Sequence, residues 1–384
     1  MFLLPPRASL SFHLTSLGLI IVIVGGCASG SEEELPSSSS GGAGTGGQEA
    51  VSGGGGGGGG PQGSGGAGGS GGQESEGSGG GTSTGSLPSL LSETGLFAGA
   101  DETLEEGVFA FTPQFELWSD GADKRRWIWL PPDTQIDSSD MDAWVFPHGT
   151  KLWKEFSRDG VRVETRLIQK SATGSWSMVA YQWRADLSDA EAVPDGVSDA
   201  SGTAHDIPEK AACAECHARV DDRVLGFSAV QLSHQDEESG SLTLEAVISL
   251  GWLTENPAPI TVPGDDTERA ALGYLHANCG HCHNPGSSVS GQVPMYLWLN
   301  VNELGAVNTT QTYLTTVNAS LTKGTGPEGP THRILPGNLE KSGLLARMES
   351  RGDDYSMPPL GTEDTDDTGL QAVQDWIMSL PTGL

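Results

Sequence analysis

The stretch TERAALGYLHANCGHCH, residues 267–283, decides the fold that the sequence predicts for the C-terminal part of the chain. Its apolar side chains recur at helical spacing, so they predict a helix over Thr267–Asn278. This helix runs directly into Cys279 and Cys282, and His283 follows at once. The sequence therefore predicts a helix that ends on two thiols and an imidazole.

The same arrangement occurs once more, as Cys213-Ala-Glu-Cys216-His217. Two thiols three positions apart reach the two vinyl groups of one porphyrin, while the adjacent imidazole reaches the iron from one face. C-x-x-C-H is accordingly the attachment pattern of c-type haem. The two pentads predict two covalently bound haem c groups, with His217 and His283 as the proximal iron ligands.

Two other uses of the cysteine pairs fit the sequence less well. Four thiolates hold zinc in some proteins, but the histidine after each pair would then have no explanation. A C-x-x-C pair also serves thiol-disulfide exchange, but neither pair follows a strand in a thioredoxin-like pattern. Haem attachment accounts for all of these residues and is favoured.

A methionine supplies an opposite ligand for the second haem. Met357 lies in Tyr355-Ser356-Met357-Pro358-Pro359, where the prolines fix the backbone after the sulfur-bearing residue. Apolar residues at helical spacing between 370 and 380 then predict a last helix, which Gly273 would allow to pack closely against the first one. We expect His283/Met357 ligation, which raises the reduction potential of a haem.

The first haem has no equally clear opposite ligand. His234 is the nearest histidine candidate after the pentad, and His205 and His276 are further options. An open sixth position, or a ligand such as Met178 from the preceding segment, is the remaining alternative.

The segment between Phe109 and Arg184 is rich in tryptophan and predicts strands. Alternating apolar and polar residues at 126–130, 161–167 and 177–183, separated by Pro, Gly and Asp, favour a small antiparallel sandwich. We expect its tryptophans to pack in the core, with an aromatic ligand surface as the alternative. Lys124, Arg125 and Arg126 form a local basic cluster, interpreted as a solvated turn, with haem propionates as alternative partners.

The N-terminus carries the features of an export signal. A sparse positive region with Arg7 precedes an apolar run that is short for a membrane span, and small residues lead up to Cys27. Val24-Gly25-Gly26-Cys27 resembles the lipobox of bacterial lipoproteins, which implies lipidation at Cys27 and, with alanine next, the outer membrane. The Gly- and Ser-dominated stretch that follows, up to residue 89, predicts a flexible tether.

Charge and cysteine content narrow the function classes. The formal net charge of −30 argues against nucleic-acid binding, which needs clustered Lys and Arg. It is compatible with electrostatic steering toward a basic partner. All five cysteines have a proposed use, one at the lipobox and four in the pentads.

Longer runs of sequence resemble a known family. Residues 115–126, 146–156 and 163–167 look like the front half of a family of exported dihaem c-type cytochromes that occur beside, or fused to, dehydrogenases of the glucose/sorbosone type. Residues 261–384 resemble a class I cytochrome c domain. The resemblance implies an accessory electron-accepting role, and the chain has no room for the dehydrogenase itself.

These observations predict a multidomain protein with a β-rich, sandwich-like N-terminal domain and an α-helical haem region that ends in a class I cytochrome c fold. The expected parts are a lipoprotein signal peptide (1–26), a tether (27–89), a Trp-containing β domain (90–200), a first haem region (201–260) and a cytochrome c domain (261–384).

The expected function is one-electron transfer outside the cytoplasm by an anchored electron carrier, not an enzyme. Its expected partners are redox proteins, a dehydrogenase among the candidates, and the membrane through the N-terminal lipid. The alternatives are a haem enzyme that reduces a small molecule such as peroxide at an open first haem, and a sensor or recognition protein that uses that haem or the Trp-rich domain.

Overall fold

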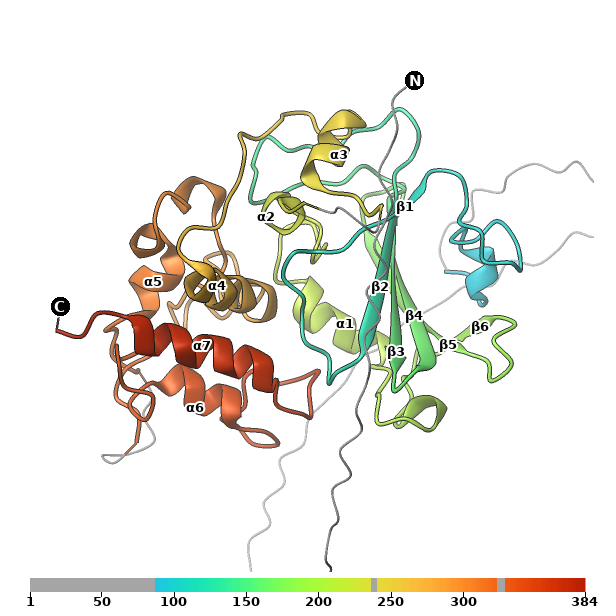
Figure 1. Cartoon of the computed structure of the whole chain (residues 1–384). Coiled ribbons are helices and arrows are strands. Elements are labelled where there is room, and N and C mark those ends of the chain that lie inside the picture. Colours follow the sequence, from blue (N-terminus) through green and yellow to red (C-terminus); the bar gives the residue numbers. More distant parts are fainter. Residues whose placement is uncertain (1–86, 236–239, 323–328, 384) are drawn as a thin grey trace, which may run out of the picture. The chain divides into compact units, whose positions relative to one another are not determined.

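A six-stranded antiparallel sheet lies at the centre of the part of the chain that the structure describes. The structure is a computed structural model, and it describes residues 87–235, 240–322 and 329–383. The strands follow one another across the sheet in chain order (Figure 1). Their bounds are β1 Val108–Ala110, β2 Asp123–Trp129, β3 Lys151–Arg158, β4 Val161–Lys170, β5 Trp176–Trp183 and β6 Ala190–Ala192.

Local sequence explains the tightest of the hairpins. Asp159 and Gly160 join β3 to β4 and both have positive φ, 53° and 77°. A two-residue hairpin turn of this kind matches the twist of its strands and favours Asp-Gly. The strand predictions for 126–130, 161–167 and 177–183 are confirmed as β2, β4 and β5; β2 begins three residues earlier and ends at Trp129, and β4 and β5 are longer than expected.

One face of the sheet carries an apolar row across four strands. Trp127, Trp153, Leu167 and Val179 stand opposite one another on four successive strands, and all are buried. The segment before β1, which includes the short helix η1 (Leu91–Glu93), packs its leucines onto them. The layer over this face is therefore a loop with a 3₁₀ turn.

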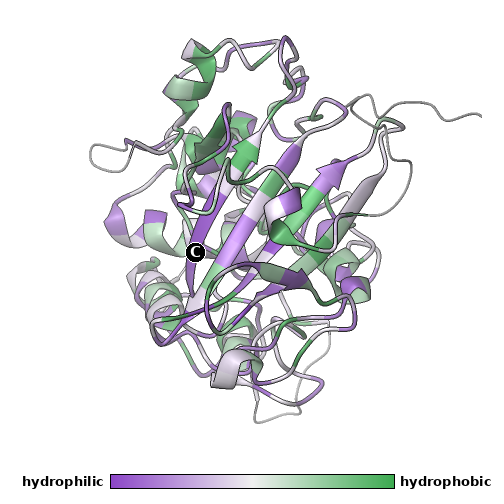
Figure 2. Ribbon diagram, turned by 90° about the vertical axis from the view of Figure 1, so that its right-hand side faces the viewer, coloured by the Kyte–Doolittle hydropathy of each residue, from purple (hydrophilic) through white to green (hydrophobic). Residues whose placement is uncertain are grey.

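The opposite face is apolar at one end only. There Ile128 and Leu152 meet the apolar side chains of α2 (Ala229–Leu232) and α3 (Leu244–Ser249). Further along the same strands this face carries charged side chains, among them Lys154. In Figure 2 green and purple segments succeed one another along the strands, because each strand carries residues of both faces.

The helices lie on this second side of the sheet (Figure 1). Besides α2 and α3 they are α1 Lys210–His217, α4 Asp266–Asn278, α5 Gln311–Thr316, α6 Gly343–Glu349 and α7 Asp367–Ser379, with short 3₁₀ turns η2 Ala200–Gly202, η3 Val301–Glu303 and η4 Val307–Thr309. The helices expected from Thr267 and from about residue 370 are confirmed as α4 and α7. A capping box between Asp265 and Glu268 fixes where α4 begins.

The packing of α4 against α7 buries the largest side chains of the C-terminal part. Leu272 and Leu275 of α4 share one core cluster with Val373 and Trp376 of α7. The close approach depends on Gly369 of α7, where a Cβ would overlap the ring of Tyr274.

The glycine that was expected to allow this approach has a different neighbour. A Cβ on Gly273 would overlap the ring of Phe115, which comes from the segment between β1 and β2. Gly273 therefore makes room for that segment.

The segment between β1 and β2 connects the sheet to the helices. The Trp118 N–H donates to Asn278 Oδ1 at 2.7 Å, and Asn278 Nδ2 donates to the Glu116 carbonyl at 3.2 Å. Asp120 accepts the backbone N–H groups of Glu363 and Asp364, both at 3.0 Å. These bonds tie the end of α4 and the loop before α7 to the segment that leads into β2.

The predicted fold class is wrong. The β-rich part is a single six-stranded sheet covered by helices and loops, not a sandwich, and helices account for 24% of the described residues, so the mainly α-helical region with a class I cytochrome c fold is not present. Between α4 and α7 only short helices form. The physical reason is local, because this stretch is rich in Gly, Pro, Ser, Thr and Asn, which favour turns over helix interiors.

The remaining predictions about organisation are not decided by the structure. The signal peptide, Cys27 and nearly all of the tether lie outside the described residues. The domain boundaries at 200 and 260 stay predictions. Within the described ranges, no helix is long and apolar enough to cross a membrane.

Candidate functional site

The first pentad forms the second half of α1, and its histidine is the last residue of the helix. Cys213 and Cys216 are three positions apart and are therefore on the same side of the helix, and both are half-buried free thiols. His217 ends the helix, and its Nδ1 lies 2.6 Å from the Arg223 carbonyl. A hydrogen bond from Nδ1–H to this carbonyl selects the tautomer in which Nε2 carries the free lone pair.

The second pentad continues from the end of α4. The N–H groups of Cys282 and His283 donate to the Cys279 carbonyl at 3.1 and 2.8 Å, so the chain makes one more helical turn. The His283 carbonyl accepts the Leu297 N–H at 2.7 Å. The Nδ1 atom of His283 is buried and has no hydrogen-bonding partner at normal distance, although the Met295 backbone lies close by.

The two pentads lie side by side, although 61 residues separate them in sequence. Asn284, directly after the second pentad, donates to the Arg219 carbonyl at 3.3 Å. The Arg219 guanidinium, two residues after the first pentad, donates to Ser288 Oγ at 2.7 Å. The structure thus joins the two motifs through the residues that follow them.

His281, the variable residue of the second pentad, lies near the histidines of both motifs. Burial, together with the proximity of His217 and His283, lowers its pKa to about 4. Burial also lowers the pKa of His217 to about 4. Neutral imidazoles keep the lone pair that a metal ligand needs.

Sequence reasoning missed His281 and Arg219. Histidine at a variable position of the pentad carries no signal of its own. The contact made by Arg219 is long-range and leaves no trace in the local pattern.

The thiols do not have the electrostatics of redox-active cysteines. Burial raises the pKa of Cys279 to about 12 and that of Cys282 to about 11, and in each case a neighbouring thiol adds to the effect. Burial also raises the pKa values of Cys213 and Cys216. Catalytic thiols of exchange enzymes have lowered pKa values instead, so the exchange alternative is disfavoured.

The histidine candidates for the sixth position of the first haem all have protein partners. His234 faces the carbonyls of Thr112 and Gln235, at 2.7 and 3.4 Å. His205 Nε2 lies 2.7 Å from Glu164, and His276 accepts the N–H of Leu299 at 3.1 Å. Ligation by His234 stays a prediction.

Met178 has a different position. It lies on β5, on the face of the sheet that α1 also contacts, and it is buried. On the same face its cross-strand neighbour is Ile168.

Met357 lies in the loop between α6 and α7, and it shares a neighbouring residue with the second pentad. Its N–H donates to the Arg347 carbonyl at 2.9 Å. The charge of Arg347 is one of those that lower the pKa of His283, after the larger effect of burial. Arg347 is thus a neighbour of both residues. Ligation by Met357 stays a prediction.

The residues present fit a covalently attached porphyrin. Each pentad offers two free thiols and a neutral imidazole, His217 has the backbone hydrogen bond that orients a proximal ligand, and His283 Nδ1 is an unpartnered buried nitrogen. In the part of the chain that the structure describes, no three His, Cys, Asp or Glu side chains gather closely enough to hold a metal ion by themselves.

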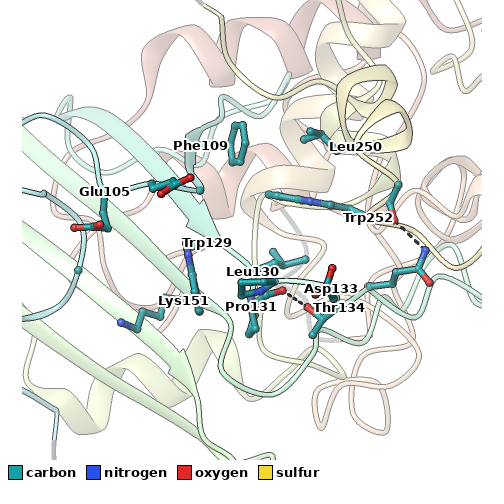
Figure 3. A pocket seen from close by; sticks show the side chains of 16 residues that line it. Glu105, Phe109, Trp129, Leu130, Pro131, Asp133, Thr134, Lys151, Leu250 and Trp252 are labelled. Carbon is teal, nitrogen blue, oxygen red and sulfur yellow. Dashed lines mark hydrogen bonds between the residues drawn. The ribbon is translucent and has the colours of Figure 1, made fainter. Parts of the chain in front are cut away.

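A cavity of about 1000 Å³ lies away from the pentads, at the edge of the sheet near β1 (Figure 3). Trp129, Trp252 and Phe109 line it together with Glu105 and Asp133. The Phe109 and Trp252 rings meet edge to face at 5.3 Å. Most other tryptophans of the Trp-rich segment are in the core, as expected, among them Trp127, Trp144, Trp153 and Trp183.

Comparison with known proteins gives no match: no protein-family model, no curated protein and no solved structure is similar to this chain. The resemblance to dihaem cytochromes therefore stays a prediction that rests on the sequence.

Proposed function

We propose that this protein is an electron carrier that binds two haem c groups covalently, one at each pentad, and moves single electrons outside the cytoplasm. The observation that carries the proposal is the contact between the pentads, made by Asn284 and Arg219. Two attachment motifs held together by hydrogen bonds favour two cofactors close enough to exchange electrons.

In this proposal the chain's own residues bind and orient the cofactors. The four pentad cysteines would form the thioethers, and His217 and His283 would bind the irons. The Arg223 carbonyl holds the His217 ring in one orientation and one tautomer. Bound haem iron supplies the one-electron chemistry, and the protein supplies position and electrostatics.

An optical redox titration, with and without carbon monoxide, tests the proposal on protein matured in an exporting host. Two haem waves that carbon monoxide does not change are expected for two six-coordinate electron-transfer centres. A chain that matures without haem under these conditions would contradict the proposal.

One observation favours a second candidate function, small-molecule reduction at the first haem. The three histidines that could close its sixth position are bound to other groups. An open iron would bind carbon monoxide, so a shift of one wave in the same titration would support this enzyme over the carrier.

The proposed location is the outer membrane, through a lipid on Cys27, with redox proteins such as a dehydrogenase as partners. The lipobox resemblance supports this part. Labelled fatty acid should be incorporated by the parent chain and not by Cys27→Ser. Equal incorporation by both would contradict the anchor.

A further inference from the structure

Three cations lie opposite one another on the helix-covered face of the sheet. Arg126 on β2 pairs with Lys154 on β3, and Lys154 pairs with Arg166 on β4. Like charges directly opposite on neighbouring strands repel and are destabilising. We call these three residues the cation row.

The protein neutralises this row only in part. Arg166 forms a salt bridge with the buried Glu164 at 2.5 Å, and Arg126 lies 3.3 Å from Glu116. Glu116 is also the carboxylate nearest to Lys124, at 3.9 Å. With Lys124, four basic side chains therefore share two carboxylates, so two of them have no carboxylate of their own.

Lys154 is the member of the row without an anion. Within the described ranges, no carboxylate lies within 4 Å of its Nζ, which faces the Phe156 ring at 4.8 Å. Arg126 Nη1 is also buried without a hydrogen-bonding partner. Burial, together with the charges of Arg126, Lys124 and Arg166, lowers the pKa of Lys154 well below its ordinary value. The centre of the row therefore lacks a carboxylate partner.

The first pentad lies over the same region. Helix α1 contacts β5, and the Lys210 N–H at its start donates to the Pro194 carbonyl at 2.8 Å. On β5, Ala180 stands opposite Arg166, so α1 packs against the strand next to the one that carries Arg166. A porphyrin attached to α1 would lie beside the strands that carry the row, with its carboxylates on the edge that faces away from the thioethers.

We propose that the cation row, with Lys154 at its centre, binds the two carboxylates of the porphyrin attached at Cys213 and Cys216. The row and Lys124 have two more basic side chains than carboxylate partners, and one porphyrin carries two carboxylates. Charge-assisted hydrogen bonds to carboxylates are the strong ones, and an anion here also relieves the repulsion between neighbouring strands. This inference rests on the proposed function, because it needs the first haem.

Lys154→Gln is the variant that tests it, because Lys154 has no protein anion to leave unpaired. Lys154→Arg restores the charge, and Arg184→Gln removes a cation whose partner is the exposed Glu191. All are compared as haem-loaded full chains by redox titration and by the resonance Raman bending bands of the haem carboxylates. We expect Lys154→Gln to lower the potential and shift the band of one haem only, Lys154→Arg to restore both, and Arg184→Gln to change neither.

A second measurement uses the unmutated row. Lysine acylation followed by mass spectrometry should modify Lys154 more in Cys213→Ser/Cys216→Ser chains than in the parent, because the missing haem would uncover it. Protection by added inorganic phosphate alone, irrespective of haem at the first pentad, would assign the row to a soluble anion and overturn the inference.

The outcomes separate this inference from the function on which it rests. Two attached haems with potentials and carboxylate bands that Lys154→Gln does not change would overturn the inference and leave the proposed function intact. A parent chain that attaches no haem would overturn the proposed function itself.

Discussion

At the scale of single residues, the sequence predicts the role of the pentad residues but not that of the basic residues on the sheet. The pentads are a local pattern, so their six residues could be identified from spacing alone. Lys154 and Arg166 occupy inward-facing positions of alternating strands, where an apolar residue is the default. A charged residue at an inward-facing position indicates a buried ionic partner. The sequence does not identify the partner, because the partner that we propose would be attached to α1, which lies far along the chain.

Met357 offers a test of the second haem's ligands. Met357→Ala should abolish the sulfur-to-iron charge-transfer band and lower the potential of one haem, because a thioether favours ferrous iron. Both haems should stay attached, since the thioethers are untouched. Met378→Ala is the control, because that side chain is 56% exposed on α7. An absorption spectrum that keeps the band in Met357→Ala would exclude this methionine.

Asp142 predicts a pH dependence of stability. Its carboxylate accepts the Val301 N–H at 2.9 and 3.2 Å, and burial raises its pKa to about 6. A folded-state pKa above the unfolded value gives stability that is fully present below the unfolded pKa and is lost as pH rises through the folded one.

Asp142→Asn should therefore lose less stability than the parent between about pH 4 and about pH 7. Chemical denaturation across this range measures it, with the exposed Asp195→Asn as the control. Parallel stability curves for parent and Asp142→Asn would show that the carboxyl is not perturbed.

At the scale of elements, periodicity located the strands and the long helices but not what covers them. The alternation in β2, β4 and β5 correctly assigns residues to two faces. It does not say whether a second sheet or a set of helices lies over each face, because both need the same apolar side chains. The sandwich prediction failed at this point.

The cytochrome-like prediction failed for a related reason. Two amphipathic helices, α4 and α7, are present and pack together as expected. The intervening residues were assigned by resemblance, and their turn-forming composition gives a largely irregular chain instead. Pairs of helices are compatible with many folds.

The close contact between α4 and α7 predicts that adding a methyl group at Gly369 lowers the stability of the protein. Gly369→Ala would place a Cβ into the ring of Tyr274, and overpacking of this kind costs about 1–3 kcal/mol. Chemical denaturation should show this loss of stability. Gly291→Ala is the matched control, because a Cβ there meets nothing within 4 Å. Equal stability of the two variants would mean that the helices can separate at no cost.

At the scale of the whole molecule, the sheet acts as the support on which both pentads are assembled. One pentad packs through α1 against the sheet, and the other is fixed at the end of α4 by the segment between β1 and β2. This arrangement could not be predicted from the sequence, because every contact that creates it is long-range.

The same arrangement gives the electron-transfer proposal its physical basis. Both attachment motifs belong to one connected set of elements, so the distance between two bound haems would be fixed by the fold. The excess of acidic residues, with a formal net charge of −30, would then favour partners that carry a positive surface.

The central claim is that both pentads carry haem, and the intact mass of the chain tests it most directly. Protein exported by a host with a cytochrome c maturation system should be heavier than the processed polypeptide by two haem groups. Cys213→Ser/Cys216→Ser and Cys279→Ser/Cys282→Ser should each lose one. A mass equal to that of the bare or lipidated polypeptide would contradict the account.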